Sequence, residues 1–494
     1  MDALAFEHHL TSPQGCGHHP SGGHGATAGG YACDDEVTLR IAVDGDHVVD
    51  AGFDAHGCGA STAAASVAVT LAKDRPILEA ALIGAHDIAH ELGGLSPGKL
   101  HAAELAADAL ARALGGAVRA DASIPRNPAN PATLVAMSGG VDSAVAAHLC
   151  ARTGPTLAVT LELWADAEND AERSCCSATA VAQARSLAHR IGIPHFTIDL
   201  RNEFRAGVVE PFIAGYTAGE TPNPCVGCNG HVRLDAMLAL ADRLGCAALA
   251  TGHYARTAES DDARGPLLRA AADPAKDQTY MLAALKPESL ARLRFPLGEL
   301  HKPQVREIAA RAGLPVASKV DSQDLCFLAG TSRARFMERH GGIDGRPGDI
   351  VDGRGAILGR HDGQHRFTVG QRRGIGVTST EPLYVLHKDG VSGRVTVGTR
   401  AELRSDRVII RAARLHRDGS RVNRVKLRYR QRPLRGRLVG SPLQGRHRAL
   451  ALALDDAVDG AAPGQLACLM DGDLVVGWGT IDGQPPHKLH ADDL

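Results

Sequence analysis

The sequence contains neither a long apolar run nor a recognisable export signal. A membrane-spanning helix needs about 18 or more consecutive apolar residues, and no such run occurs in the chain. The first ten residues, MDALAFEHHL, lack a basic stretch followed by an apolar one, which is the pattern of a secretory signal. We therefore expect a cytoplasmic protein that has no membrane partner. In a reducing cytosol, its eleven cysteines are expected to serve catalysis or metal binding before structural disulfides.

The sequence also has almost no net charge, because 54 Lys and Arg residues nearly balance 56 Asp and Glu residues. Residues 1–118 nevertheless hold 5 basic and 15 acidic residues, whereas residues 404–448 hold 15 basic and only 2 acidic residues. Such asymmetry indicates that a polyanion binds the C-terminal part and that the acidic part suits a protein partner. A merely solvated basic surface is the alternative. Within RVNRVKLRYR, alternation predicts a strand face that carries four cations: Arg424, Lys426, Arg428 and Arg430.

A length of 494 residues predicts about three domains, since one domain usually holds roughly 100–200 residues. An apolar fraction of 44% is ordinary for a globular protein, so wholesale disorder is excluded. Three prolines in DASIPRNPANP and the lack of hydrophobic periodicity there indicate a linker. We predict six parts: a flexible Gly/His-rich arm (1–30), an α+β domain (31–118), the linker (119–131), an α/β domain (132–330), a small central β-rich domain (331–403) and a C-terminal basic, barrel-like β domain (404–494).

Strands alternate with helices in the 132–330 domain. TLVAM, TLAVTLELW, HFTIDL and CAALATGHY have the composition of buried strands, and AVAAHLCART and ATAVAQARSLAHRIG have helical spacing. This alternation predicts an α/β fold with a doubly wound, mostly parallel sheet. In the preceding domain, VTLRIAV and HVVDAGFDAHG predict a hairpin with Asp44 and Gly45 at its turn.

A phosphate-binding loop directly follows the first strand of this α/β domain, where residues 138–143 have the sequence SGGVDS. The glycines let the backbone approach an anion, the serine hydroxyls donate to it, and the next helix adds the positive end of its dipole. The loop is not a Walker motif, because the Gly-Lys-Ser/Thr ending is missing. It resembles the pyrophosphatase-loop motif SGGxDS of enzymes that adenylate a carbonyl group and expel pyrophosphate.

Later motifs resemble, in order, those of the tRNA-specific 2-thiouridylase family of the MnmA type. Two cysteine motifs are TPNPCVGCN at residues 221–229 and SQDLCF at residues 322–327. The ATP- and tRNA-contact segments are TGHY at 251–254 and KDQTY at 276–280, and FTVGQRRGIGV, RYRQ and PGQ continue the match. The resemblance covers about residues 132–485 and implies a pyrophosphatase-loop (adenine nucleotide alpha hydrolase-like) fold. One departure is SCCSATAVAQAR, where the family usually has acidic residues after Cys-Cys-Ser.

This resemblance implies an ATP-dependent transferase that places sulfur at position 2 of the wobble uridine of tRNA. ATP, with Mg²⁺, would adenylate the 2-carbonyl oxygen of uracil, because AMP leaves where oxide does not. A cysteine persulfide would supply the sulfur, and a second cysteine would cleave the sulfur–sulfur bond by thiol–disulfide exchange. AMP and pyrophosphate would be released. By position, Cys326 would carry the persulfide and Cys228 would be the other catalytic cysteine.

The resemblance also assigns contacts to individual residues. ATP would contact Ala136, Met137, Ser138, Gly139, Gly140, Val141, Asp142, Ser143, Leu161 and Gly252. The target base, flipped out and unpaired as is common in RNA recognition, would contact Asn223, Pro224 and Cys225. The rest of the tRNA would contact His253, Lys276, Asp277, Gln278, Arg428, Tyr429 and Gln465.

Two alternative chemistries stay open. Three thiolates, from Cys225, Cys228 and Cys326, could hold a 4Fe–4S cluster whose open iron binds hydrosulfide. A four-cysteine zinc site is disfavoured, since a second Cys-x-x-Cys does not accompany the first in the sequence. Pyrophosphatase loops also occur in amide-forming ligases, so an adenylating ligase without sulfur chemistry is the other alternative.

The acidic N-terminal domain resembles iron–sulfur scaffold proteins of the IscU/NifU type over residues 31–116. The resemblance implies a four-ligand site for zinc or an iron–sulfur cluster, although Ala102 stands where the family has its last cysteine. A degenerate domain kept for docking is the alternative. We expect the domain to recruit a cysteine desulfurase or a sulfur-relay protein and to pass on sulfur or a cluster. Its candidate ligands are Cys33, Asp35, Cys58 and His101.

Overall fold

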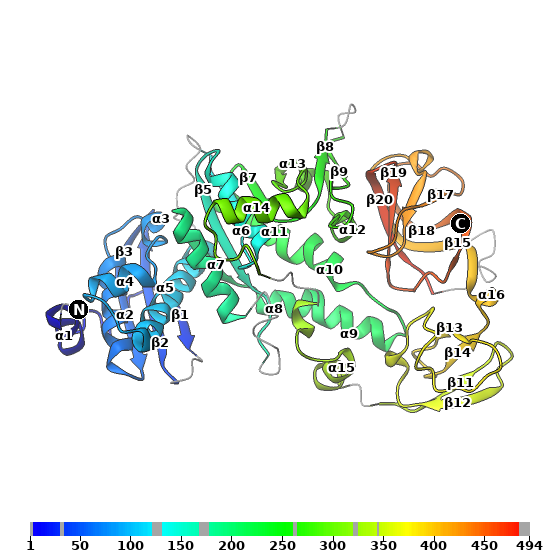
Figure 1. Cartoon of the computed structure of the whole chain (residues 1–494), viewed down its shortest axis with the longest axis horizontal. Helices are drawn as coiled ribbons and strands as arrows, with labels where there is room; N and C mark the ends of the chain where they lie inside the picture. The colour runs from blue at the N-terminus through cyan, green and yellow to red at the C-terminus, as the bar shows by residue number, and fades with distance from the viewer. Residues whose placement is uncertain are drawn as a thin grey trace. The chain divides into compact units, whose positions relative to one another are not determined.

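The computed structural model divides the chain into two compact units, whose elements Figure 1 shows. The first unit contains residues 1–201, 235–253 and 292–329, and the second contains residues 202–234, 254–291 and 330–494. In the described part of the chain, no helix has the length and apolar character that crossing a membrane requires. The structure describes residues 3–29, 34–120, 131–166, 177–259, 264–319, 325–342 and 345–483.

The N-terminal domain of the first unit has an antiparallel sheet in the order β1-β2-β3, against which helices α2 and α5 pack (Figure 1). The β2–β3 hairpin turns at Gly45, whose φ is 60°, so the hairpin predicted from Asp-Gly is confirmed. Alternate residues of β2, Val37, Leu39 and Ile41, are completely buried. The bounds are α1 Ala3–Thr11, β1 His24–Gly29, β2 Glu36–Asp44, β3 His47–His56, α2 Gly59–Ala72, α3 Ile77–Ala80, α4 Ala85–Glu91 and α5 Leu100–Ala120.

Residues 3–29 are structured, so the prediction of a flexible arm is wrong for them. His9 Nδ1 and Ser66 Oγ lie 2.9 Å apart and join α1 to α2, and every residue of β1 pairs with β2. Small residues without hydrophobic periodicity pair in this way because the ladder uses backbone groups and the neighbouring strand supplies the apolar face. At the other end of the domain, α5 continues through Ala120 into the predicted linker; residues 121–130 lie outside the described part of the chain.

The α/β domain of the first unit has a five-stranded parallel sheet in the order β10-β7-β4-β5-β6, which confirms the predicted fold class. All seven residues of β5 are buried, as expected when helices cover both faces of a sheet. The strand order reverses at β4, which is where ligands bind open α/β sheets. The bounds are β4 Thr133–Ala136, α6 Val141–Ala151, β5 Thr156–Glu162, α7 Ala178–Ile191, β6 His195–Asp199, α11 Leu234–Arg243, β7 Ala248–Thr251, β10 Leu293–Arg294 and α14 Lys302–Arg311.

The second unit contains a helical segment, a small sheet and a β-barrel. The helical segment includes α9 Glu210–Thr217, α10 Pro224–Gly227, the π-helix η3 Cys228–Arg233 and α12 Thr279–Leu282. The small sheet has the strand order β12-β11-β14-β13, and its core contains Ile350, Val385 and Val395. Its bounds are β11 Gly348–Val351, β12 Ile357–His361, β13 Tyr384–Lys388 and β14 Val395–Gly398.

The barrel consists of six strands in the order β15-β18-β17-β16-β19-β20, and pairing of β15 with β20 closes it. The hairpin β8–β9 extends β20. The interior is apolar, with Ile410, Val425 and Leu469 completely buried. The bounds are β8 Arg256–Ala258, β9 Leu267–Arg269, β15 Arg404–Leu415, β16 Arg424–Lys426, β17 Leu434–Leu438, β18 Gly445–Asp459, β19 Leu466–Asp471 and β20 Leu474–Ile481.

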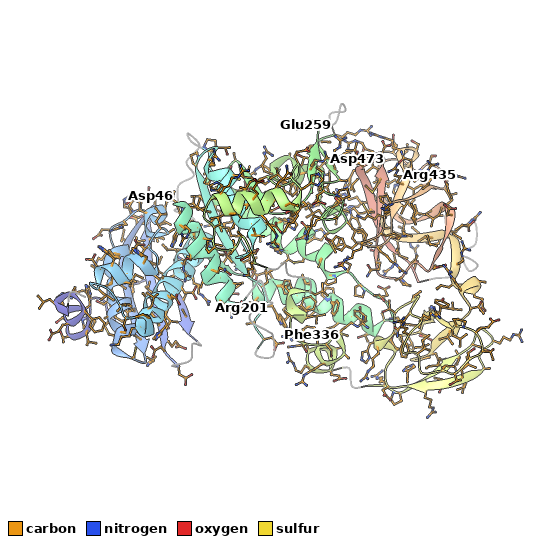
Figure 2. The ribbon with its side chains drawn as sticks, viewed as in Figure 1. Asp46, Arg201, Glu259, Phe336, Arg435 and Asp473 are labelled. Atoms are coloured by element: carbon orange, nitrogen blue, oxygen red, sulfur yellow. The ribbon has the colours of Figure 1, made fainter. Side chains whose placement is uncertain are left out.

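The predicted cationic strand face is wrong, because β16 ends at Lys426 and the chain then turns. Lys426 is itself buried and forms an ion pair with Asp277 at 3.1 Å. Arg428 and Arg430 are exposed on the turn that follows. Other cations lie on the outside of the barrel, among them Arg435 of β17 (Figure 2). The barrel is therefore basic through its turns and its outer side chains.

Candidate active site

The phosphate loop connects β4 to α6 at the carboxyl end of the parallel sheet. Gly140 is the N-cap of α6, and the eleven-residue helix directs its positive end toward the loop. Ser143 Oγ accepts the N–H of Ser138 at 3.2 Å and donates to the carbonyl of Gly140 at 3.1 Å. The two serine hydroxyls are 3.2 Å apart. These bonds hold the loop in a shape that suits a phosphate group.

Two glycines allow close approaches that any side chain would prevent. Gly139 has φ of 68°, and a Cβ there would lie 2.7 Å from the carbonyl oxygen of Ala180. Gly252 follows β7, and a Cβ there would lie 2.7 Å from the amide nitrogen of Ser143. Three other predicted ATP residues are buried: Ala136 ends β4, Met137 follows it, and Leu161 lies in β5. The first unit therefore contains every residue predicted to contact ATP.

Two lysines that the sequence analysis missed contact this loop. Lys302 Nζ, on the first residue of α14, lies 2.8 Å from both carboxylate oxygens of Asp142. Lys319 Nζ donates to the carbonyl of Gly139 at 3.2 Å and to Gln183 Oε1 at 2.5 Å. The only sequence signals for them are the position of Lys302 at a helix start and that of Lys319 just before SQDLCF. Both ammonium groups add positive charge beside the loop.

The first cysteine motif lies on a helix start in the second unit. Asn223 is the N-cap of α10, and its Oδ1 accepts the N–H of Cys225 at 3.1 Å. Its Nδ2 lies 3.6 Å from Met281 Sδ. Cys228, which is 7% exposed, is the first residue of the π-helix η3, and such helical irregularities occur often at functional sites. The predicted base-contact residues and Cys228 are thus adjacent in one short helical segment.

The second cysteine, Cys326, belongs to the first unit, whereas Cys228 belongs to the second. Cys326 is partly exposed and begins a short 3-10 helix, Cys326–Leu328. The next side chain, Phe327, is 1% exposed and anchors this turn in the core. Residues 322–324 of the same motif lie outside the described part of the chain.

Three cysteines outside the two motifs are packed thiols. Burial raises the pKa of Cys150 to about 11 and that of Cys246 to about 12. Burial likewise raises the pKa of Cys468 to about 12. These groups stay protonated and inert near neutral pH, because the thiolate is the reactive form.

The segment predicted to contact tRNA is partly occupied by internal bonds. The carboxylate of Asp277 accepts Thr279 Oγ1 at 2.8 Å as well as Lys426 Nζ. Gln278 Oε1 accepts the N–H of Tyr254 at 2.9 Å. Lys276 remains partly exposed. The geometry therefore fits a direct RNA contact for Lys276 better than for its two neighbours. In the first unit, His253 Nδ1 lies 2.9 Å from Thr251 Oγ1.

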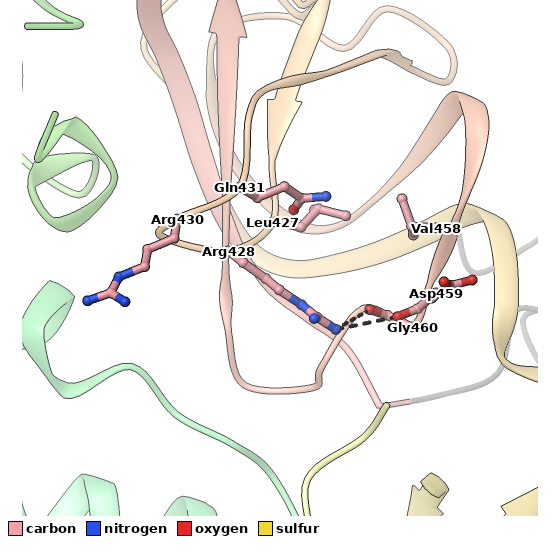
Figure 3. Close-up of a pocket in the computed structure, with 7 residues that line it drawn as sticks. All are labelled: Leu427, Arg428, Arg430, Gln431, Val458, Asp459 and Gly460. Atoms are coloured by element: carbon pink, nitrogen blue, oxygen red, sulfur yellow. Dashed lines mark hydrogen bonds between the residues drawn. The ribbon is translucent and has the colours of Figure 1, made fainter. Parts of the chain in front are cut away.

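Arg428 lies at a cavity of about 440 Å³ on the barrel (Figure 3). Its Nη2 donates to the carbonyls of Asp459 and Gly460 at 3.4 and 2.9 Å. Figure 3 shows the Arg430 side chain directed away from these carbonyls. The ring of Tyr429 lies 6.4 Å from that of Tyr280. Burial, followed by the nearby Asp277 carboxylate, raises the pKa of Tyr429, so its hydroxyl is a neutral donor.

Gln465, another predicted tRNA contact, joins the barrel to the first cysteine motif. Its Nε2 donates to the carbonyl of Thr221 at 2.6 Å, and its Oε1 accepts Tyr280 Oη at 3.4 Å. The N–H of Thr221 donates to the carbonyl of Pro463 at 2.7 Å, and Glu220 forms an ion pair with Arg411 of β15. The barrel thus holds Glu220 and Thr221, where the TPNPC motif begins.

In the N-terminal domain, Asp35, Cys58 and His101 form the one group of potential metal ligands found among the described residues, with ligand atoms within 4.8 Å of one another. Asp35 Oδ2 accepts Cys58 Sγ at 3.1 Å and Ser61 Oγ at 2.7 Å, and lies 3.2 Å from His101 Nε2. Burial alone would raise the pKa of Asp35, but the hydrogen bonds from Ser61 and Cys58 outweigh it and lower that pKa well below its usual range. The predicted ligand Cys33 lies outside the described residues. The donor set therefore fits three positions of a zinc or cluster site.

Comparison with family models divides the chain into four matches. Residues 132–330 match the tRNA methyl transferase HUP domain, and residues 5–117 match the NifU-like N-terminal domain. Residues 334–399 match the tRNA methyl transferase PRC-barrel domain, and residues 407–481 match the aminomethyltransferase β-barrel domain.

Similar proteins extend over nearly all of the chain. A bifunctional protein NifU/MnmA of Rubrobacter xylanophilus is 43% identical over 490 residues, covering 96% of this chain and 97% of its own. A tRNA-specific 2-thiouridylase MnmA of Zymomonas mobilis is 42% identical and covers 73% of this chain and 95% of its own. A solved iron–sulfur scaffold protein of Fervidobacterium islandicum is 22% identical and covers 22% of this chain and 93% of its own, with a TM-score of 0.20.

Proposed function

Because the chain belongs to the MnmA family of tRNA-specific 2-thiouridylases and has a NifU-like domain at its N-terminus, we propose that it catalyses ATP-dependent 2-thiolation of the wobble uridine of tRNA. One observation carries the proposal: the SGGVDS loop and the two cysteine motifs occur in the same chain. The loop alone would suit any adenylating enzyme. The cysteines supply the group that delivers sulfur.

The adenylation step uses the phosphate loop. The α6 N-terminus and the hydroxyls of Ser138 and Ser143 would bind the phosphates of ATP, and Lys302 and Lys319 would offset their negative charge. Attack of the uracil 2-oxygen on the α-phosphorus would expel pyrophosphate. The resulting adenylate converts a poor leaving group into AMP.

The sulfur step uses the two cysteines. The terminal sulfur of a Cys326 persulfide would attack C2 of the adenylated uracil, and AMP would leave with the former 2-oxygen. Cys228 would then attack the inner sulfur of Cys326, so that the thiolated base is released and a disulfide remains between the two cysteines. An external thiol must reduce this disulfide before the next turnover. Asn223, Pro224 and Cys225 would line the pocket of the flipped base.

Purified protein tests this proposal directly. With unmodified tRNA, ATP, a sulfur source and a reducing thiol, we expect 2-thiouridine, AMP and pyrophosphate in equal amounts. Cys228→Ser and Cys326→Ser should each lower thiolation by about 10³-fold or more, since each removes a reacting atom. Cys16→Ser, at an exposed cysteine outside both motifs, should have no effect. Retained thiolation in both catalytic variants would contradict these cysteine roles, and AMP and pyrophosphate formed without any 2-thiouridine would support a ligase without sulfur chemistry.

A 4Fe–4S cluster held by Cys225, Cys228 and Cys326 is the alternative sulfur chemistry. Protein purified without oxygen would then be coloured and contain iron, and it would lose thiolation when the iron is removed. Colourless, iron-free and fully active protein would exclude the cluster. We favour the persulfide because it requires only the two catalytic cysteines.

The NifU-like domain is proposed to receive sulfur or a cluster from a cysteine desulfurase or a relay protein. Asp35, Cys58 and His101 would hold a metal or cluster, or Cys58 would carry sulfur. Cys58→Ser should slow thiolation driven by desulfurase and cysteine. It should leave thiolation driven by inorganic sulfide unchanged, because sulfide can attack the Cys228–Cys326 disulfide and give the Cys326 persulfide and the Cys228 thiol without the N-terminal domain. Equal rates with both sulfur sources would contradict this role.

A further inference from the structure

Strand β6 is an edge strand of the ATP-binding sheet, yet its outer side is covered by the NifU-like domain. In an extended strand, alternate residues direct their N–H and C=O groups to the same side, and His195, Thr197 and Asp199 face away from β5. The N–H of His195 donates to the carbonyl of Ala81 at 3.0 Å. The carbonyl of Asp199 accepts Arg119 Nη1 of α5 at 2.7 Å. An open edge would otherwise pair with other chains.

Between these two contacts, α5 touches the middle of the same edge. A Cβ at Gly115 would lie 2.0 Å from the carbonyl oxygen of Thr197, so only glycine allows the helix to come this close. The next residue, Gly116, has no atom within 4 Å of such a Cβ. Glycine destabilises the middle of a helix relative to alanine. Gly115 is thus explained by the contact with β6.

A buried charge cluster lies beside this contact. Asp108 of α5 pairs with Arg185 of α7 at 2.5 Å and with Arg112 at 3.0 Å, and Arg112 reaches Glu162 of β5 at 2.7 Å. Asp108, Arg185 and Glu162 are each at most 7% exposed. Buried charges must keep their partners, because an unpaired one costs several kcal/mol. The cluster therefore requires the two domains to stay together in one arrangement.

We propose that α5 and the turn at Ala81 form a permanent docking surface for the outer edge of β6. The NifU-like domain is then a fixed arm of the ATP-binding domain and presents Asp35, Cys58 and His101 from a constant position. It is not a mobile carrier domain that is held to the ATP-binding domain only by the linker. This inference concerns the assembly of the two domains and is independent of the reaction that the protein catalyses.

The test uses the full chain with a specific protease site introduced within residues 121–130. After complete cleavage, the two fragments should elute together in size-exclusion chromatography at micromolar concentration. The matched variants are Gly115→Leu and Gly116→Leu, which place the same side chain at adjacent positions of one helix. The nicked Gly116→Leu protein should stay associated like the parent, whereas the nicked Gly115→Leu protein should separate.

Hydrogen exchange of the uncut chains gives a second measurement. The segment containing β6 should be protected in the parent and in Gly116→Leu, and it should exchange at least about tenfold faster in Gly115→Leu. Unchanged exchange in α6 and β7 shows that the variant is folded. Separation of the nicked parent protein would overturn the proposal, as would a folded Gly115→Leu protein that stays associated. If Gly115→Leu does not fold, the nicked parent protein alone decides.

Discussion

Single residues beside the phosphate loop show how the proposed ATP site is charged. The ammonium group of Lys302, the first residue of α14, contacts both carboxylate oxygens of Asp142 in the loop. Lys302→Met should lower ATP-dependent AMP formation at least about tenfold, because charge-assisted hydrogen bonds contribute roughly 1.5–3 kcal/mol each. Lys302→Arg should restore part of the rate. Equal AMP formation by the methionine variant and the parent would show that the pair is not used.

Gln465 is a positioning residue for the first cysteine motif, because both ends of its amide are bonded within the protein. Gln465→Ala removes a hydrogen bond to the carbonyl of Thr221, so the backbone of the TPNPC motif should shift. We expect kcat for thiolation to fall about tenfold, as the loss of about 1–1.5 kcal/mol implies. The Kd for tRNA and its salt dependence should stay the same. A weaker Kd with unchanged kcat would instead identify Gln465 as a tRNA contact.

Arg430 provides the opposite case, since it is exposed on the turn after β16 and extends away from the internal contacts of Arg428 (Figure 3). If it contacts a phosphate, Arg430→Ala should weaken tRNA binding and lower the slope of log Kd against log salt by about 0.7–0.9. The kcat at saturating tRNA should not change. Binding titrations at several salt concentrations measure both quantities, and an unaltered slope would remove Arg430 from the docking surface.

At the scale of secondary-structure elements, periodicity predicted the α/β sheet and the SGGVDS motif predicted its phosphate loop, because strand, loop and helix are local patterns. The β2–β3 hairpin was also predictable, since Asp-Gly fixes its turn. Pairing of β1 was not, because its glycines and alanines have no hydrophobic period and depend on a neighbour. Lys302 and Lys319 could not be assigned to the loop, since their contacts join residues far apart in sequence.

Strand β13 contains a buried lysine that makes stability depend on pH. Burial, followed by the nearby Arg333, lowers the pKa of Lys388 to about 7, whereas the unfolded value is about 10.4. Between these values the unfolded chain binds one more proton, so stability should rise as pH increases from about 7 to 10. Below about pH 7, the folded protein carries a buried charge.

Replacing this lysine should remove that dependence. In Lys388→Met, the rise of the unfolding temperature between about pH 7 and 10 should be smaller than in the parent protein. Lys286→Met removes a partly exposed lysine of the same unit and serves as the control. Calorimetry at several pH values gives the comparison, and identical profiles for the parent and Lys388→Met would refute the assignment.

At the scale of the whole molecule, the near-neutral total charge results from an acidic N-terminal domain and a basic barrel. The two segments serve different partners in the proposed function, since tRNA requires cations and a sulfur-delivery protein does not. The sequence identified both segments because charge can be counted. It could not show that the predicted cationic strand face breaks at Lys426, which an ion pair with Asp277 buries.

The central claim is that this chain thiolates tRNA at position 2 of the wobble uridine. The most direct measurement is nucleoside analysis of tRNA from a strain that lacks the gene, with and without a plasmid copy. We predict that 2-thiouridine derivatives disappear in the deletion strain, return with the parent protein and do not return with Cys326→Ser. Unchanged 2-thiouridine derivatives in the deletion strain would contradict the account.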